Sequence, residues 1–118
     1  MRVTGRVCDR NPSTEETDVY DLKNLTKFKQ LGELAPEAFR AFVAFDAAAF
    51  DGGVIPLKYK ELMAVAVALT TQCPYCIEIH ATKARAAGAT GQELAEATLV
   101  AAALRAGGAM THGTHTLE

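Results

Sequence analysis

The sequence predicts an all-α protein: a single domain of five to six helices. Alanine accounts for 22 of the 118 residues, which favours closely packed helices over sheets. Apolar residues recur every three to four positions, and neither a β-hairpin turn nor a sustained alternation of apolar and polar residues is found. A chain of this length forms one hydrophobic core. We therefore expect one helical domain over residues 18–118, preceded by a flexible polar arm over residues 1–17.

The first two expected helices are amphipathic. One begins near Val19 and is expected to stop at Gly32. The next begins at Pro36, a residue that fits the first turn of a helix, and stops at the Asp-Gly-Gly sequence of residues 51–53. Three phenylalanines of this second helix are expected to fill the core: Phe39, Phe42 and Phe45.

Three further helices are expected, over residues 56–71, 73–87 and 90–106. The first of them is apolar on nearly every face after Glu61, so it is expected to be the central buried element. The last begins with a capping box formed by Thr90 and Glu93. The glycine pair 107–108 is expected to break or kink it, with a last short helix expected over residues 109–117.

Composition and charge exclude several classes of function. Net charge is -2 and neither sign is clustered, so no surface for nucleic acid or an anionic membrane is expected. The longest apolar run, residues 62–69, has eight residues, whereas a membrane span needs roughly 18 or more. Residues 1–21 lack the apolar stretch of a secretory signal. We expect a cytoplasmic protein that acts on a small molecule.

Two cysteines and a histidine form the candidate active centre. Cys73, Cys76 and His80 are three and four residues apart, which places them on one face of a helix. Pro74 puts Cys73 near the N-cap and Cys76 in the first turn, where free backbone amides and the helix dipole stabilise a thiolate. His80 lies one turn beyond Cys76 and can take up its proton. Cys76 is therefore the expected nucleophile, and Cys73 is the resolving thiol that closes a disulfide.

Two further side chains are expected to join this proton network. Glu61 lies on the preceding helix, and an antiparallel helix pair would bring His80 back to its level. An apolar run follows Glu61 directly, so its carboxylate is expected to be at least partly buried and in need of a partner. Tyr75, between the cysteines, can offer its hydroxyl to the same network.

The spacing of these residues resembles a known signature. Glu61, eleven residues, Cys73, two residues, Cys76, three residues and His80 is similar to the pattern of AhpD-like alkylhydroperoxidases within the carboxymuconolactone decarboxylase family. The resemblance covers roughly residues 34–117. It implies an all-α fold that assembles as homo-oligomers, commonly trimers or hexamers.

The resemblance also implies an activity. In a peroxidase or disulfide-exchange reaction of this family, Cys76 would attack the hydroperoxide, Cys73 would resolve it, and Glu61 and His80 would relay protons. The family often has a histidine where this chain has Tyr75. The expected partners are a small hydroperoxide and a dithiol electron donor, lipoyl-like or thioredoxin-like, and no cofactor or metal is expected.

Other interpretations of the cysteine pair remain. With His80 it offers three zinc ligands, but a structural zinc site needs a fourth, and no second knuckle exists. A purely structural cysteine pair in the core is another alternative. A glutaredoxin-like site, suggested by the Pro-Tyr dipeptide between the cysteines, requires strands that this sequence lacks. No role is expected for Cys8, His112 or His115.

Two other functions stay open beside the peroxidase. One is a cofactor-free decarboxylase like the family's namesake, a chemistry that does not call for two neighbouring thiols. The other is a non-enzymatic, oligomeric redox sensor whose disulfide alters assembly. Amphipathic helices in a chain this short leave apolar surface uncovered, which agrees with the homo-oligomers that the resemblance implies.

Overall fold

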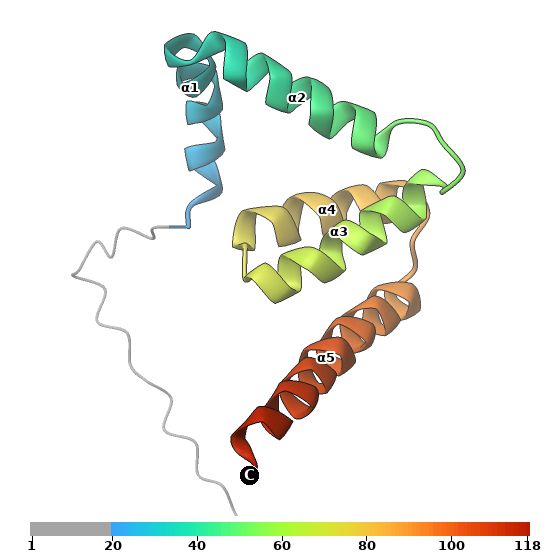
Figure 1. Ribbon diagram of the computed structural model, residues 1–118. Helices are drawn as coiled ribbons and strands as arrows, with labels where there is room; N and C mark the ends of the chain where they lie inside the picture. Colours follow the sequence, from blue (N-terminus) through green and yellow to red (C-terminus); the bar gives the residue numbers. More distant parts are fainter. Residues whose placement is uncertain (1–19) are drawn as a thin grey trace, which may run out of the picture.

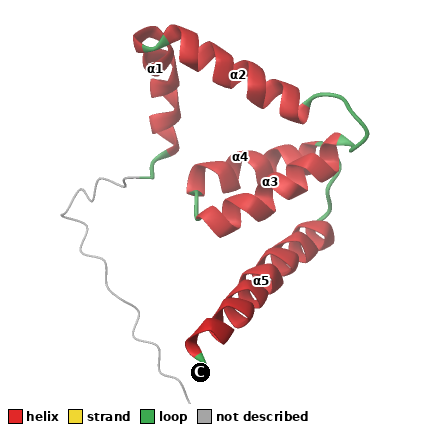
Figure 2. Cartoon of the chain, in the orientation of Figure 1, coloured by secondary structure: helices red, strands yellow, loops and turns green. Residues whose placement is uncertain are grey.

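A computed structural model of the chain describes residues 20–118, and every regular element in this part is a helix (Figures 1 and 2). The all-α prediction is confirmed. The elements are η1 (Leu22–Lys27), α1 (Phe28–Leu34), α2 (Pro36–Phe50), α3 (Leu57–Thr71), α4 (Pro74–Ala86), α5 (Gly91–Gly113) and η2 (Thr114–Thr116). The predicted arm over residues 1–17, including Cys8, lies outside the described residues.

The centre of the fold is an antiparallel pair formed by α3 and α4, with α5 packed against α3 (Figure 1). A two-residue link joins the pair, so the start of α4 lies beside the end of α3. The α1 and α2 helices form a second, separate segment, the α1–α2 arm, which makes few contacts with α3. The central helix pair therefore carries the candidate active centre, and the other helices support it from outside.

Local signals set most helix ends where the sequence predicts them. Thr90 and Glu93 form the predicted capping box at the start of α5, with Thr90 Oγ1 accepting from the Glu93 amide at 3.1 Å. After α2, Gly52 and Gly53 adopt φ values of 57° and 92°, which side chains disfavour. Gly88 does the same after α4, with a φ of 97°.

The prediction that Gly32 stops the first helix is wrong. Gly32 lies inside α1, which ends at Leu34. The stop comes from Pro36, since a residue before proline is disfavoured in the helical region, and Ala35 has a φ of -137°. Gly32 is needed for packing instead. A Cβ there would lie 2.8 Å from the Phe39 ring, so any larger residue would force that ring to shift.

The predicted break at residues 107–108 is also wrong. The α5 helix continues through both glycines to Gly113, and within residues 109–117 only the short 3-10 helix η2 (Thr114–Thr116) is separate from it. Neither glycine adopts a left-handed conformation, and without one a glycine does not end a helix. Each glycine costs the helix about 1 kcal/mol relative to alanine, which a helix of 23 residues can absorb.

The core of the single chain is small, and most buried residues are alanines. The buried residues are Glu61, Val65, Ala68, Ala84, Ala89 and Ala101. The prediction that three α2 phenylalanines fill the core is wrong for the single chain. Phe42 and Phe45 are 57% and 71% exposed, and Phe39 packs on Phe28 within the arm, with ring centroids 6.1 Å apart. The cause is the divergence of the arm from the central helices (Figure 1).

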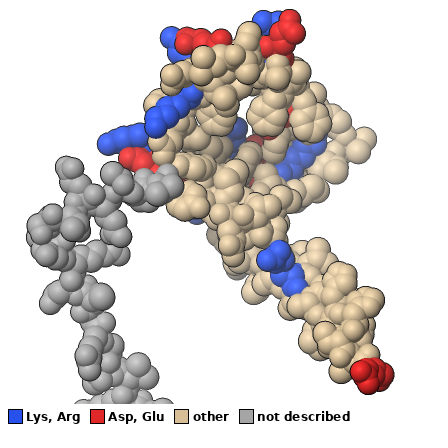
Figure 3. Space-filling view, turned by 60° about the vertical axis from the view of Figure 1, so that its left-hand side comes forward, with Lys and Arg blue, Asp and Glu red and all other residues tan. Residues whose placement is uncertain are grey.

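The surface of α5 is strongly apolar. Between residues 97 and 117 its only charged side chain is Arg105, and Figure 3 shows this projecting helix covered almost entirely by uncharged atoms. Leu104 and Met110 are 77% and 78% exposed. None of the helices within residues 20–118 is both long and apolar enough to cross a membrane. The apolar face of α5 therefore lies open in the single chain.

An ion pair joins the start of α3 to the start of α5. Lys58 Nζ lies 2.9 Å from Glu93 Oε1, while Glu93 Oε2 accepts the Thr90 amide at 2.9 Å. The hydrogen bond from Lys58, and then that from the Thr90 amide, lowers the pKa of Glu93 below its ordinary value of 4.5. The pair therefore adds stability that is fully present above about pH 4.5 and is lost as the pH falls through the folded pKa.

We expect Glu93→Gln to lower the melting temperature at pH 7, because the amide removes the ion pair while its oxygen can still accept the Thr90 amide hydrogen. The difference from the unmodified protein should shrink as the pH falls through the folded pKa of Glu93. Circular dichroism melts between pH 7 and pH 3 measure this. A gap that stays constant over the whole range would contradict the assignment.

Candidate active site

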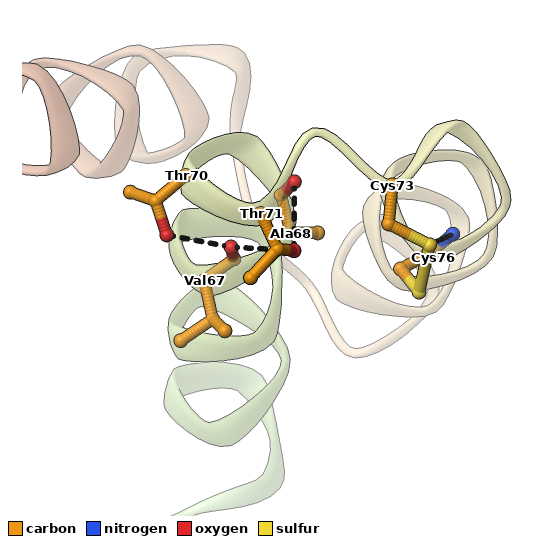
Figure 4. The surroundings of a disulfide bond; sticks show 6 residues. All are labelled: Val67, Ala68, Thr70, Thr71, Cys73 and Cys76. Carbon is orange, nitrogen blue, oxygen red and sulfur yellow. Dashed lines mark hydrogen bonds between the residues drawn. A yellow bond between two sulfur atoms is a disulfide. The ribbon is translucent and has the colours of Figure 1, made fainter.

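The two cysteines lie at the N-terminus of α4 and are joined by a disulfide (Figure 4). Cys73 is the N-cap residue, Pro74 takes the first helical position and Cys76 follows in the first turn, as predicted. The Cα atoms of the cysteines are 5.3 Å apart. The amide of Cys76 donates to Cys73 Sγ at 3.3 Å. Both sulfurs therefore lie where unpaired amides and the positive end of the helix dipole favour a thiolate.

A tight turn between α3 and α4 holds the disulfide. Gln72 adopts a left-handed conformation, with a φ of 55°, and so reverses the chain at the end of α3. The Cys73 amide then donates back to the Ala68 carbonyl at 3.1 Å. Thr71 Oγ1 donates to the Val67 carbonyl at 3.1 Å (Figure 4). These bonds satisfy carbonyls at the end of α3, which is why so short a link can set the start of α4.

The structure brings Glu61 and His80 together across the central helix pair. Glu61 Oε2 lies 2.6 Å from His80 Nδ1, and only 3% of Glu61 is exposed. When the Glu61 carboxylate is ionised it can only accept a hydrogen bond, and Nδ1 of His80 is then the donor. In the neutral imidazole, Nε2 then holds the free electron pair. The pair can therefore act as an oriented base.

Phe50, the last residue of α2, covers the imidazole. The rings of Phe50 and His80 are stacked, with centroids 5.2 Å apart and planes 11° from parallel. Sequence reasoning missed this residue. The core prediction named three other phenylalanines of the same helix, and nothing in the spacing linked Phe50 to a histidine 30 residues later.

Tyr75 faces the N-terminal part of the described chain. Asn24 Nδ2 donates to Tyr75 Oη at 3.1 Å, and the Tyr20 ring lies 5.9 Å from the Tyr75 ring, centroid to centroid. Sequence reasoning missed both partners, because they lie about fifty residues away and belong to no motif. Among the described residues, His80 hydrogen-bonds to Glu61 and to neither sulfur in this disulfide state.

A cavity reaches Glu61 from the side of α4 that lies beyond His80. It has a volume of about 380 Å³ and is lined by Leu57, Glu61, Lys83, Ala86 and Ala87. Glu61 is one of these lining residues, and neither cysteine is among them.

The remaining polar candidates lie elsewhere. His112 lies in the last turn of α5 and His115 lies in η2, with ring centroids 6.1 Å apart at the C-terminal end of the chain (Figure 1). Within residues 20–118, no group of three or more histidine, cysteine and acidic side chains is arranged to hold a metal ion. The structure thus gathers four of the predicted site residues at the α3–α4 pair: Glu61, Cys73, Cys76 and His80.

Residues 36–118 match the sequence model of the carboxymuconolactone decarboxylase family. The chain belongs to this family. The matched range includes the disulfide, the Glu61–His80 pair and Phe50, whereas Tyr20 and Asn24 precede it. Membership confirms the resemblance found from the spacing of the four residues. The family includes AhpD-like peroxidases and decarboxylases. Membership therefore limits the reaction to these classes but does not choose between them.

Relatives in this family occur in several bacteria. A protein of Paracoccus denitrificans, "Uncharacterized protein 4 in cox locus", is 47% identical over 77 residues, which are 65% of this chain and 69% of the relative. An uncharacterized protein of Haemophilus influenzae is 46% identical over 57 residues, 48% of this chain and 50% of the relative. One of Cupriavidus necator is 39% identical over 70 residues, 59% of this chain and 62% of the relative. The matches thus span only half to about two thirds of these relatives.

We expect His80→Ala to destabilise the protein by about 2 to 3 kcal/mol, because it leaves the buried Glu61 carboxylate without its hydrogen-bond donor. Glu61→Gln should cost about 1 kcal/mol, since its amide oxygen can still accept from Nδ1. Urea unfolding of both variants measures the difference. Equal losses would show that the hydrogen bond does not stabilise the buried carboxylate.

Proposed function

We propose that the protein is a thiol-dependent peroxidase of the alkylhydroperoxidase type, which reduces an organic hydroperoxide and forms the Cys73–Cys76 disulfide. One observation carries the proposal: a bonded cysteine pair at a helix N-terminus, one turn before a histidine that is paired with a buried carboxylate. These are the parts that a thiol needs to ionise, react and be resolved. Family membership supports this class of chemistry.

In the first step His80 takes the proton of the Cys76 thiol, and the thiolate attacks the terminal oxygen of the hydroperoxide. The O–O bond breaks, Cys76 is oxidised to a sulfenic acid, and the leaving alkoxide takes the proton from His80 to become the alcohol. Glu61 assists by holding Nδ1, so that Nε2 is the nitrogen that gains and returns the proton.

In the second step the Cys73 thiolate attacks the sulfenic sulfur, and hydroxide leaves as water after protonation. The product is the disulfide, and the amide of Cys76 is already directed at Cys73 Sγ, where it stabilises the attacking thiolate. A dithiol donor then reduces the disulfide by exchange and is itself oxidised. Over the cycle, hydroperoxide and dithiol become alcohol, water and disulfide.

The proposal includes assembly as a homo-oligomer, a trimer or a hexamer, in which a second copy covers α5. Apolar side chains of this helix are largely open, with Leu99 at 68%, Val100 at 65% and Leu104 at 77% exposure. Val100 and Leu104 also line a cavity of about 300 Å³ between α3 and α5, whose lining is mostly apolar. Contiguous apolar surface of this kind is rarely left in water by a soluble monomer.

We expect Cys76→Ser to abolish consumption of cumene hydroperoxide and His80→Gln to slow it about 100-fold, as for loss of a general base. Cys73→Ser should allow one turnover and accumulate a sulfenic acid on Cys76. Cys8→Ser is the matched control and should leave the rate unchanged. Stopped-flow kinetics with a dithiol donor, followed by mass spectrometry of trapped adducts, gives each result. If both thiols are unchanged after peroxide treatment, the proposed peroxidase activity is refuted and the decarboxylase chemistry of the family is favoured.

We expect Leu104→Glu to convert the oligomer into monomers, because a charge would be buried at the interface between copies. Gln92→Glu is the matched control, since it places the same side chain in the first turn of α5, where a negative charge is favourable. Light scattering at micromolar concentration reports the mass of each. A monomeric unmodified protein would refute the assembly.

A further inference from the structure

The C-terminal end of α2 is fastened to α3 by Lys60. Its Nζ donates to the Ala49 carbonyl at 2.9 Å and to the Gly52 carbonyl at 2.8 Å. The last carbonyls of a helix lack helical partners and lie at the negative end of the helix dipole, so an ammonium group there is favourable on both counts. Lys60 precedes Glu61 in α3, and the cap is therefore built into the turn that carries the buried carboxylate.

This attachment places Phe50 at the active site. Much of α2 is exposed, including Phe42 and Phe45, whereas Phe50 is half-buried and lies flat against His80. Because α2 otherwise touches α3 sparingly, the Lys60 cap and the Phe50 stack are its principal described attachments to the central pair. The contacts follow one another along the chain, since Ala49 accepts from Lys60 and the next residue carries the ring.

The two contacts of His80 constrain different motions. The hydrogen bond to Glu61 holds one atom of the ring, Nδ1, at 2.6 Å, but by itself it does not fix the tilt of the ring plane about the Cβ–Cγ bond. A parallel phenyl ring with its centroid 5.2 Å away restricts this tilt, because a large turn of the imidazole would bring its edge towards the phenyl face. With both contacts in place, the direction of the Nε2 electron pair is set.

We propose that Phe50 is a positioning residue for His80, and that Lys60 acts through it by capping α2. This inference rests on the proposed role of His80 in proton transfer. The reaction needs Nε2 to be oriented towards a thiol one helical turn away. Loss of this orientation lowers the rate even when the base is present. The phenyl ring also keeps water from one face of the imidazole, so fewer hydrogen-bond partners compete for the proton.

The first test compares a flat ring with an apolar side chain of similar size. We expect Phe50→Leu to slow peroxide-driven oxidation of Cys76 about tenfold, since misalignment of a reacting group can cost up to about 100-fold. Phe50→Tyr, which keeps the ring, should stay within about twofold of the unmodified protein. Phe39→Leu is the matched control, because it removes a ring pair of the same arm away from the site.

The second test does not depend on turnover. In protein labelled with ¹⁵N-histidine, and with His80→Gln for assignment, the unmodified chain should show one set of His80 signals with Nδ1 protonated. Phe50→Leu should mix the tautomers and remove the ring-current shift of the imidazole protons, while Phe50→Tyr and Phe39→Leu should not. Lys60→Met should change the tautomer mixture and the ring-current shift of His80 in the same direction as Phe50→Leu does. Lys58→Met is the control for this variant.

The two tests separate the positioning role from the peroxidase activity. If the unmodified protein does not react with peroxide, the proposed activity falls, and the histidine signals alone decide the role of Phe50. His80 signals in Phe50→Leu that match those of Phe39→Leu would overturn the inference. So would an oxidation rate in Phe50→Leu that equals the rate of Phe50→Tyr.

Discussion

A carboxylate with only 3% of its surface exposed must have a partner, and in this protein the partner is His80. The hydrogen bond between them spans the α3–α4 pair, so it sets the register at which the two helices lie. That register, together with the left-handed turn at Gln72, determines where α4 starts and hence where its unpaired amides point. The placement of Cys73 and Cys76 follows from the same constraint.

The site divides its tasks among elements of different origin. The N-terminus of α4 supplies the electrostatic environment of the sulfurs, the α3–α4 contact supplies an oriented base, and α2 contributes the ring of Phe50. Outside this centre the single chain buries little, and α5 leaves Leu104 open. A tightly paired centre with loosely covered outer helices supports the proposed assembly, in which other copies complete the packing.

Sequence reasoning succeeded where one local interaction decides the structure. The capping box of Thr90 and Glu93 lies within a single turn, and Pro36 is suited to the first position of a helix whatever surrounds it. Glycine was less informative. Gly32 and the pair at 107–108 continue their helices, because a glycine ends a helix only when it adopts the left-handed conformation, and the residue type does not require that.

The sequence by itself determined the all-α class and the set of Glu61, Cys73, Cys76 and His80, because their spacings on one helix and across one short turn leave few ways to place them. Only the tertiary structure decided that Phe50 covers the imidazole and that the α1–α2 arm diverges from the central helices. Helical periodicity records which side of a helix is apolar, but not which other helix it meets. Contacts between distant elements depend on packing of the whole chain, and no local pattern encodes them.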